Sequence, residues 1–169
     1  MSPTVYQIDG PWSGQLAIVP RPRGGDWLDD ALRSLSDAGF NVVVSLLTPP
    51  EAEELGVSDE AKISAKHEMN FMSFPIPDLG VPNSKIATSE LLVGLLSDVR
   101  AGKKIAIHCR QGIGRSGLIA SSLLVMAGID PVVAFRKVSA ARGFQVPETQ
   151  EQRDWVIELA HDVGELAKA

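Results

Sequence analysis

The sequence predicts one α/β domain over residues 1–169, with a mostly parallel central sheet of four to five strands and helices on both faces. Three observations lead to this fold class. Short apolar segments alternate with segments of helical periodicity, which is the pattern of repeated strand-helix-strand units. A chain of 169 residues, 44% hydrophobic and 22% charged, can bury one ordinary core. We find no internal repeat, long linker or low-complexity tract.

The expected strands are short and rich in apolar or β-branched residues, as strands buried on both faces of a parallel sheet are. Segments of helical periodicity lie between them. In chain order the expected strands are QLAIVP (15–20), NVVVSLL (41–47), FMSFPI (71–76) and KIAIHC (104–109).

The first expected helix lies within residues 26–40, where Leu28, Leu32 and Leu35 recur at helical spacing. We expect Asp26 to cap its amino end, because a carboxylate accepts hydrogen bonds from the free amides of the first turn. Gly39 stands where such a helix ends.

Four further helices are expected. Residues 114–128 form a nearly all-apolar helix that ends at Gly128, and Asp130-Pro131 supplies the cap and first-turn proline of the next. The last helix runs from about Glu148 to the end of the chain. Residues 84–100 form a helix that Gly102 ends, with an apolar stripe of Ile86, Leu91, Leu92, Leu95, Leu96 and Val99.

Composition narrows the possible functions. A net charge of −5 argues against general binding of nucleic acid or of an anionic membrane. The single cysteine excludes an intramolecular disulfide and a four-thiolate zinc site, and the three histidines have no ligand spacing, so we expect no metal and no cofactor. Without a signal segment or a long apolar run, the chain is expected to be a cytoplasmic monomer without stable membrane association.

Candidate functional residues follow the expected strands. Parallel α/β sheets bind ligands beyond the carboxyl ends of their strands. The segments that follow the strands carry Arg21, Arg23, Asp78, Cys109 and Arg115. We therefore expect these side chains to meet in one crevice.

The stretch IHCRQGIGRSGL, residues 107–118, contains the only cysteine. Gly112 and Gly114 allow a tight turn whose amides, with the positive end of the following helix, form an anion site. The Arg115 guanidinium can bind two oxygens of phosphate, sulfate or vanadate. A thiol in this field ionises readily, so Cys109 is expected to be a thiolate nucleophile. The expected phosphate-binding residues are Arg110, Gln111, Gly112, Ile113, Gly114 and Arg115.

Two competing interpretations of this stretch exist. A lone intracellular cysteine is often a small buried hydrophobic residue. A glycine-rich phosphate loop also occurs in nucleotide-binding proteins, but those need Lys and then Ser or Thr after the last glycine, whereas Gly114 is followed by Arg115 and Ser116.

The segment HCRQGIGRSG resembles the signature of the cysteine-dependent protein tyrosine phosphatase superfamily, and the chain is most similar to the small atypical dual-specificity phosphatases. The resemblance implies that Asp78, in FPIPDLGVP, is the general acid, that Ser116 donates to the leaving sulfur and that Gln152 positions the hydrolytic water. Asp78 could instead cap a turn, and Gln152 with Glu148 could be a plain helix start.

Several neighbouring residues receive supporting roles. His108 should point away from the phosphate, since successive strand residues face opposite ways, and bond to nearby backbone. Arg110 and Gln111 should fan outward to the rim. Arg21 and Arg23 either add positive charge at the rim or are solvated loop residues, and the second interpretation is favoured. The same two interpretations apply to the basic residues Arg136, Lys137 and Arg142.

The function expected from the resemblance is hydrolysis of phosphotyrosine, and of phosphoserine and phosphothreonine in a shallow pocket, through a cysteinyl-phosphate. Arg110 occupies a position that is Lys in some phosphoinositide phosphatases, so a lipid or small-molecule phosphate is a second candidate substrate, although Ile113 is neutral. Three further classes stay open, namely a rhodanese-like sulfurtransferase, an arsenate reductase and a non-catalytic phospho-binding module.

Overall fold

The computed structural model describes residues 2–168, with side chains as far as residue 164. Its sheet has five strands in the order β1-β2-β5-β3-β4. β1 pairs with β2 antiparallel, and the other pairs are parallel. The added strand β1 has three residues, too few to produce a readable alternation. The strands are β1 (Tyr6–Ile8), β2 (Gln15–Ile18), β3 (Val42–Ser45), β4 (Asn70–Ser73) and β5 (Lys104–His108).

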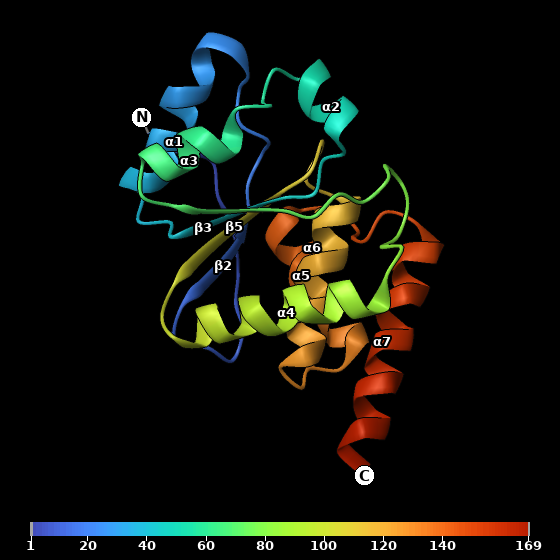
Figure 1. Cartoon of the computed structure of the whole chain (residues 1–169). Coiled ribbons are helices and arrows are strands. Elements are labelled where there is room, and N and C mark those ends of the chain that lie inside the picture. The colour runs from blue at the N-terminus through green and yellow to red at the C-terminus, as the bar shows by residue number, and fades with distance from the viewer. Residues whose placement is uncertain (1, 169) are drawn as a thin grey trace.

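Helices cover both faces of the sheet, which confirms the predicted fold class (Figure 1). α1, α2 and α3 lie on one side, and α4, α5, α6 and α7 on the other (Figure 1). α2 and α3 were not predicted, because lengths of 6 and 7 residues give no helical period. The helices are η1 (Gly25–Trp27), α1 (Leu28–Asp37), α2 (Pro49–Glu54), α3 (Glu60–Lys66), α4 (Lys85–Arg100), α5 (Gly114–Met126), α6 (Pro131–Arg142) and α7 (Gln150–Lys168).

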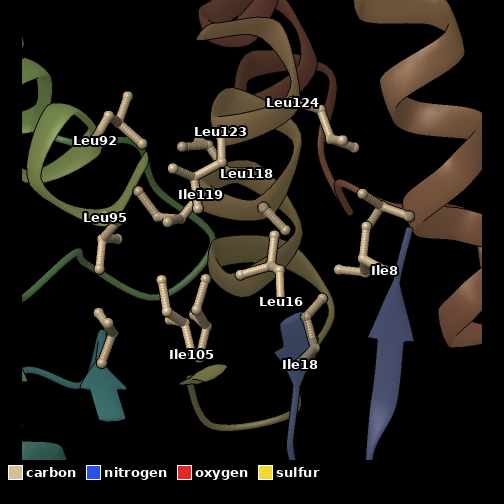
Figure 2. Close-up of a cluster of buried hydrophobic side chains, with 14 of the residues drawn as sticks. Ile8, Leu16, Ile18, Leu92, Leu95, Ile105, Leu118, Ile119, Leu123 and Leu124 are labelled. Atoms are coloured by element: carbon tan, nitrogen blue, oxygen red, sulfur yellow. The ribbon is translucent and has the colours of Figure 1, made fainter. Parts of the chain in front are cut away.

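Alternate residues of each central strand enter different cores. Ile105 and Ile107 belong to the core under α4 and α5, whereas Ala106 belongs to the core under α1. Figure 2 shows Ile105 directed toward Leu118 and Ile119 of α5. This alternation has a functional consequence at the end of β5, since it directs two adjacent side chains to opposite faces.

Helix ends mostly follow the sequence signals. Gly39 and Gly102 adopt left-handed φ angles of 92° after α1 and α4, and Asp130 accepts a hydrogen bond from the Val132 amide. The expected cap at Asp26 is wrong. A 3-10 turn occupies Gly25–Trp27, and the residue that precedes α1 is Trp27, without a side-chain cap bond.

The apolar stripe of α4 includes one error. Ile86 is 76% exposed, while the other five residues are buried. Thr88 takes the inward position in this turn, and its hydroxyl donates to the Ser84 carbonyl at 2.6 Å. Residues two apart on a helix lie about 200° apart, so Ile86 must face the solvent. Over residues 2–168, no helix is both long and apolar enough to cross a membrane.

Candidate active site

Arg115 joins three segments at the carboxyl edge of the parallel strands. Its Nη1 donates to the Ile76 carbonyl, beyond β4, at 2.9 Å and to Glu51 Oε1, in α2, at 2.7 Å. Its Nη2 donates to Glu51 Oε2 at 2.9 Å and to Asp78 Oδ1 at 3.2 Å. The expected crevice therefore brings Asp78 and Arg115 together, at the start of α5.

Arg115 is buried in its ion pair with Glu51, and Glu51 is nearly so. The side chain of Arg115 is 2% exposed and that of Glu51 is 12% exposed. The bond from Arg115 lowers the pKa of Glu51 to about 2, against the opposing effect of burial. Burial alone would lower the pKa of Arg115, but the bond to Glu51 and the charge of Cys109 raise it above its ordinary value.

This pairing orients the guanidinium. Glu51 occupies the edge formed by Nη1 and Nη2. Asp78 Oδ1 also accepts from Nη2, so an oxyanion that binds the edge formed by Nε and Nη2 must take the place of Asp78 there. Because Arg115 stays charged, its guanidinium keeps its affinity for anions across the physiological pH range.

Glu51 was not identified from the sequence. Its signal was the spacing of a capping box, Thr48 followed by Glu51, at the start of α2. The Thr48 amide donates to Glu51 Oε1 at 3.0 Å. One carboxylate thus caps a short helix and holds Arg115 at the same time.

Cys109 begins a tight turn that we call the cysteine loop, residues 109–115. Cys109 Sγ accepts a hydrogen bond from the Gly112 amide at 3.1 Å, and the side chain is 2% exposed. Gly112 has a left-handed φ of 71°, and a Cβ there would stand 3.3 Å from Ile18 Cγ2. A glycine at this position lets the chain turn so that an amide faces the sulfur.

Two arginines bind the outer, carbonyl side of the cysteine loop. Arg21 Nη1 donates to the Arg110 carbonyl at 2.9 Å. Arg142 donates from Nε to the Gly112 carbonyl at 2.8 Å and from Nη2 to the Gln111 carbonyl at 3.2 Å. Arg21 is exposed, as expected, and bonds to the loop as well, whereas the half-buried Arg142 is not merely solvated, because the turned loop presents carbonyls that need donors.

His108 lies on the opposite face from Cys109, as strand alternation predicts. Its Nε2 lies 2.5 Å from Glu60 Oε1 in α3, and both side chains are buried. The expected bond to nearby backbone is wrong, since Nδ1 has no hydrogen-bond partner within the described part of the chain. The partner Glu60 comes from a helix that the sequence did not reveal.

Asp78 lies at the mouth of the site, on the aspartate loop, residues 77–80. Its side chain is 61% exposed, and Oδ1 accepts from the Leu79 amide at 3.1 Å as well as from Arg115. The bond comes from the amide of the next residue, whereas the side chain that caps a turn accepts from the amide two residues on.

The carboxyl-terminal segment reaches the cysteine loop. Gln152 is fully buried, and a Cβ added to Gly114 would stand 3.0 Å from its amide atoms and 3.2 Å from Glu148 Oε2. Gln152 Nε2 also donates to the Gly80 carbonyl at 3.0 Å, which ties the start of α7 to the aspartate loop.

Three further predicted residues have distinct surroundings. Ser116 Oγ is buried without a hydrogen-bond partner among residues 2–168, so the expected bond to sulfur is not formed in this structure. Arg110 is directed to the rim, where its guanidinium pairs with Glu54 at 3.2 Å. Ile113 packs against the core, and Gln111 is exposed.

The sheet and the loop together define a class of protein. A cysteine at the end of the central strand, an arginine six residues later at the start of a helix and an acid on a neighbouring loop are the arrangement of the cysteine-dependent phosphatases. Residues 19–129 match the family model described as "Polymorphic toxin system, DSP-PTPase phosphatase", and the chain belongs to this family.

Individual relatives agree with this assignment. "Putative tyrosine phosphatase 197R" of Invertebrate iridescent virus 6 is 35% identical over 91 residues, which cover 52% of this chain. The match covers 33% of the viral protein, so this chain spans about a third of that relative's length.

Solved structures share the fold over nearly the whole chain. Tk-PTP in its active form is 29% identical, with a TM-score of 0.78 over 95% of this chain and 99% of its own. Kinase-associated phosphatase with its catalytic-site cysteine replaced by serine has a TM-score of 0.89 over 97% of both chains. At 20% identity, this second similarity concerns the fold alone.

Proposed function

We propose that the chain hydrolyses phosphomonoesters on tyrosine, and on serine and threonine, of cytoplasmic protein or peptide substrates. The observation that carries this proposal is the placement of Cys109 Sγ under the Gly112 amide, within a loop that also presents Arg115. The cysteine loop thus carries both a nucleophile and an oxyanion site, as phosphoryl transfer to sulfur requires.

In the first step, the thiolate of Cys109 attacks phosphorus as the bond from phosphorus to the ester oxygen breaks. The loop amides and the Arg115 guanidinium hold the three equatorial oxygens. Asp78 gives its proton to the departing oxygen, so an alcohol leaves and a cysteinyl-phosphate remains. The position of Asp78 at the mouth, 3.2 Å from Arg115, supports this role.

In the second step, water attacks phosphorus and the bond from sulfur to phosphorus breaks. Asp78, now a carboxylate, accepts a proton from the water, and inorganic phosphate leaves. We assign the orientation of this water to Gln152, and its position beside Gly114 and its bond to the aspartate loop support this assignment. Ser116 Oγ, buried without a partner among the described residues, is available to donate to the leaving sulfur.

The test is phosphate release from a panel of phosphopeptides by the wild type and by Cys109→Ser. We expect Cys109→Ser to lose at least about 10⁴-fold in kcat, since no covalent intermediate can form efficiently on a hydroxyl. The variant should still bind phosphopeptide, because the loop amides and Arg115 remain.

Chemical denaturation of Cys109→Ser supplies the control, since an unchanged midpoint excludes unfolding as the cause. Phosphate release by Cys109→Ser at the wild-type rate would contradict the proposed nucleophile. Sulfur transfer from thiosulfate without phosphate release would instead favour a sulfurtransferase.

A further inference from the structure

Leu79, the residue that follows the proposed general acid, combines backbone strain with exposure. Its φ angle is 61°, in the left-handed region, where the Cβ of an L-residue crowds the following carbonyl oxygen. It is also 56% exposed, which is ordinary for a single leucine but not for a strained one. Among the described residues other than glycine, only Glu68 shares a positive φ, and it lies directly after the C-cap of α3, where helices often adopt this conformation.

The bonds around Leu79 impose this conformation. The Gly80 amide donates to the Pro77 carbonyl at 2.8 Å, which closes a β-turn with Asp78 and Leu79 at its two central positions. The Gly80 carbonyl in turn accepts from Gln152 Nε2. A positive φ at the second central position favours glycine or asparagine. Leucine therefore adds strain that either residue would relieve, and such strain is usually retained where a function depends on it.

The position of Leu79 relative to a substrate follows from the role proposed for Asp78. To protonate the ester oxygen, Asp78 must lie within hydrogen-bond distance of it. Consecutive Cα atoms are about 3.8 Å apart, so Leu79 lies within side-chain reach of the atoms bonded to that oxygen. In phosphotyrosine these atoms belong to an aromatic ring. In phosphoserine and phosphothreonine, one aliphatic carbon leads directly to the polar backbone.

The aspartate loop leaves Leu79 free to make this contact. Asp78 Oδ1 accepts from Arg115 Nη2 in this structure, so an entering oxyanion displaces the carboxylate before it reaches the leaving group. Leu79 belongs to neither of the two hydrophobic cores among the described residues. It can therefore move with Asp78 without disrupting any core packing.

We propose that Leu79 is a specificity residue, whose side chain packs against the ring of phosphotyrosine and favours it over phosphoserine and phosphothreonine. The inference rests on the function proposed above, because Asp78 places Leu79 beside the leaving group. Contact with the ring removes from water a leucine that is exposed in the free enzyme, and this burial is favourable. The preferred substrates are then aromatic phosphomonoesters.

The test compares peptides of one sequence that carry phosphotyrosine, phosphothreonine or phosphoserine at the same position. We expect kcat/KM of the wild type to be about tenfold or more higher for phosphotyrosine. This preference should persist as ionic strength rises from about 0.05 to about 0.5 M, because salt does not screen an apolar contact. Since a phenol leaves more easily than an alcohol, the decisive measurement is the change on substitution of Leu79.

Leu79→Asn is the diagnostic variant, because asparagine tolerates a positive φ but removes the apolar side chain. It should lower kcat/KM for phosphotyrosine by about fivefold or more beyond any loss for phosphothreonine. The midpoint of urea denaturation should stay equal or rise, since the strain is relieved. Leu79→Met keeps an apolar side chain and should retain most of the preference.

The matched control is Val93→Asn. Val93 lies on α4, outside the candidate active site, and is 57% exposed, which nearly equals the exposure of Leu79. This variant loses an exposed apolar side chain in the same way. It should leave the ratio of kcat/KM values for phosphotyrosine and phosphothreonine unchanged.

A ratio of kcat/KM values for phosphotyrosine and phosphothreonine that Leu79→Asn does not change would overturn the inference. Phosphate release by the wild type would then leave the proposed function intact. A ratio that Leu79→Met lowers as far as Leu79→Asn would also overturn it. Calorimetric binding of the same peptides to Cys109→Ser, with and without Leu79→Asn, makes the comparison without turnover. The role of Leu79 is therefore tested even if no peptide releases phosphate.

Discussion

The two loops of the candidate active site are held in opposite ways. Cys109, Gly112, Gly114 and Arg115 of the cysteine loop are buried, and the guanidiniums of Arg21 and Arg142 bind the loop's carbonyls from outside. The aspartate loop is open to solvent, with the Asp78 side chain 61% exposed and bonded only to Leu79 and Arg115 among the described residues. Arg115 belongs to the first loop and contacts the second.

This difference corresponds to two chemical requirements. A site that stabilises charge on a transferring phosphoryl group must have its dipoles fixed before the reaction, because reorienting them costs free energy. A group that gives and then accepts a proton in each cycle must exchange that proton with water. Burial suits the first requirement and exposure the second.

Asp78→Asn tests the exposed loop and should have a larger effect than changes at Glu51 or Arg142. Asparagine keeps an oxygen for the Leu79 amide but cannot donate the proton. We expect kcat/KM for an alkyl phosphate to fall by about 10³-fold. The loss for p-nitrophenyl phosphate, whose leaving group needs little protonation, should be about tenfold or less.

The control for this variant is Asp59→Asn, at an exposed carboxylate that makes no side-chain cap bond to α3. Equal losses on the two substrates would show that Asp78 does not act as an acid.

Glu51→Gln tests how firmly the buried side is held. Glutamine preserves the capping box of α2 but leaves Arg115 buried without its charged partner. The pKa of Glu51 lies at about 2, below its ordinary value of 4.5. We expect the free energy of unfolding at pH 7 to fall by about 3 kcal/mol, measured by urea denaturation.

The pH dependence of this loss follows from the direction of the shift. A depressed pKa in the folded state stabilises the fold above pH 4.5, and this stabilisation disappears as the pH falls toward 2. The difference between wild type and Glu51→Gln should therefore be full at neutral pH and vanish near pH 2. Glu53→Gln, on the exposed side of α2, should change stability little. A difference independent of pH would contradict the role of this charge.

Arg142→Gln removes one external support of the cysteine loop and should have the smallest effect. The carbonyls of Gln111 and Gly112 lose their guanidinium donor, but water can replace part of it because Arg142 is only half-buried. We expect kcat/KM for a singly phosphorylated peptide to fall by about tenfold. Wild-type kcat/KM in this variant would mean that the loop holds its shape without external donors.

Much of the site could be predicted from the sequence because its residues lie close together along the chain. The spacing from Cys109 to Arg115 lies within one loop, and the glycines that allow its turn lie between them. Asp78 could be proposed because it lies in a loop that follows one of the predicted parallel strands. Parallel strands end at the same edge of the sheet, so this loop lies at the same edge as the cysteine loop.

The residues that contact the cysteine loop and its neighbours could not be predicted from the sequence, because they come from distant segments. Glu51 is 64 residues from Arg115, and Glu60 is 48 residues from His108. Both lie on helices too short to show a period, and only packing of α2 and α3 against the sheet brings them into contact. Arg142 is 30 residues beyond Gly112. The apolar pattern of its helix predicts which face is buried but does not predict the contacts of a polar residue at the end of the helix.

By itself, the sequence determined the α/β fold, the cysteine loop and the class of chemistry, since each depends on local backbone preferences and short spacings. Only the tertiary structure decided which carboxylate orients Arg115, which acid pairs with His108 and which arginines support the cysteine loop. Such pairings depend on the distance between side chains after folding, and a separation along the chain does not specify that distance.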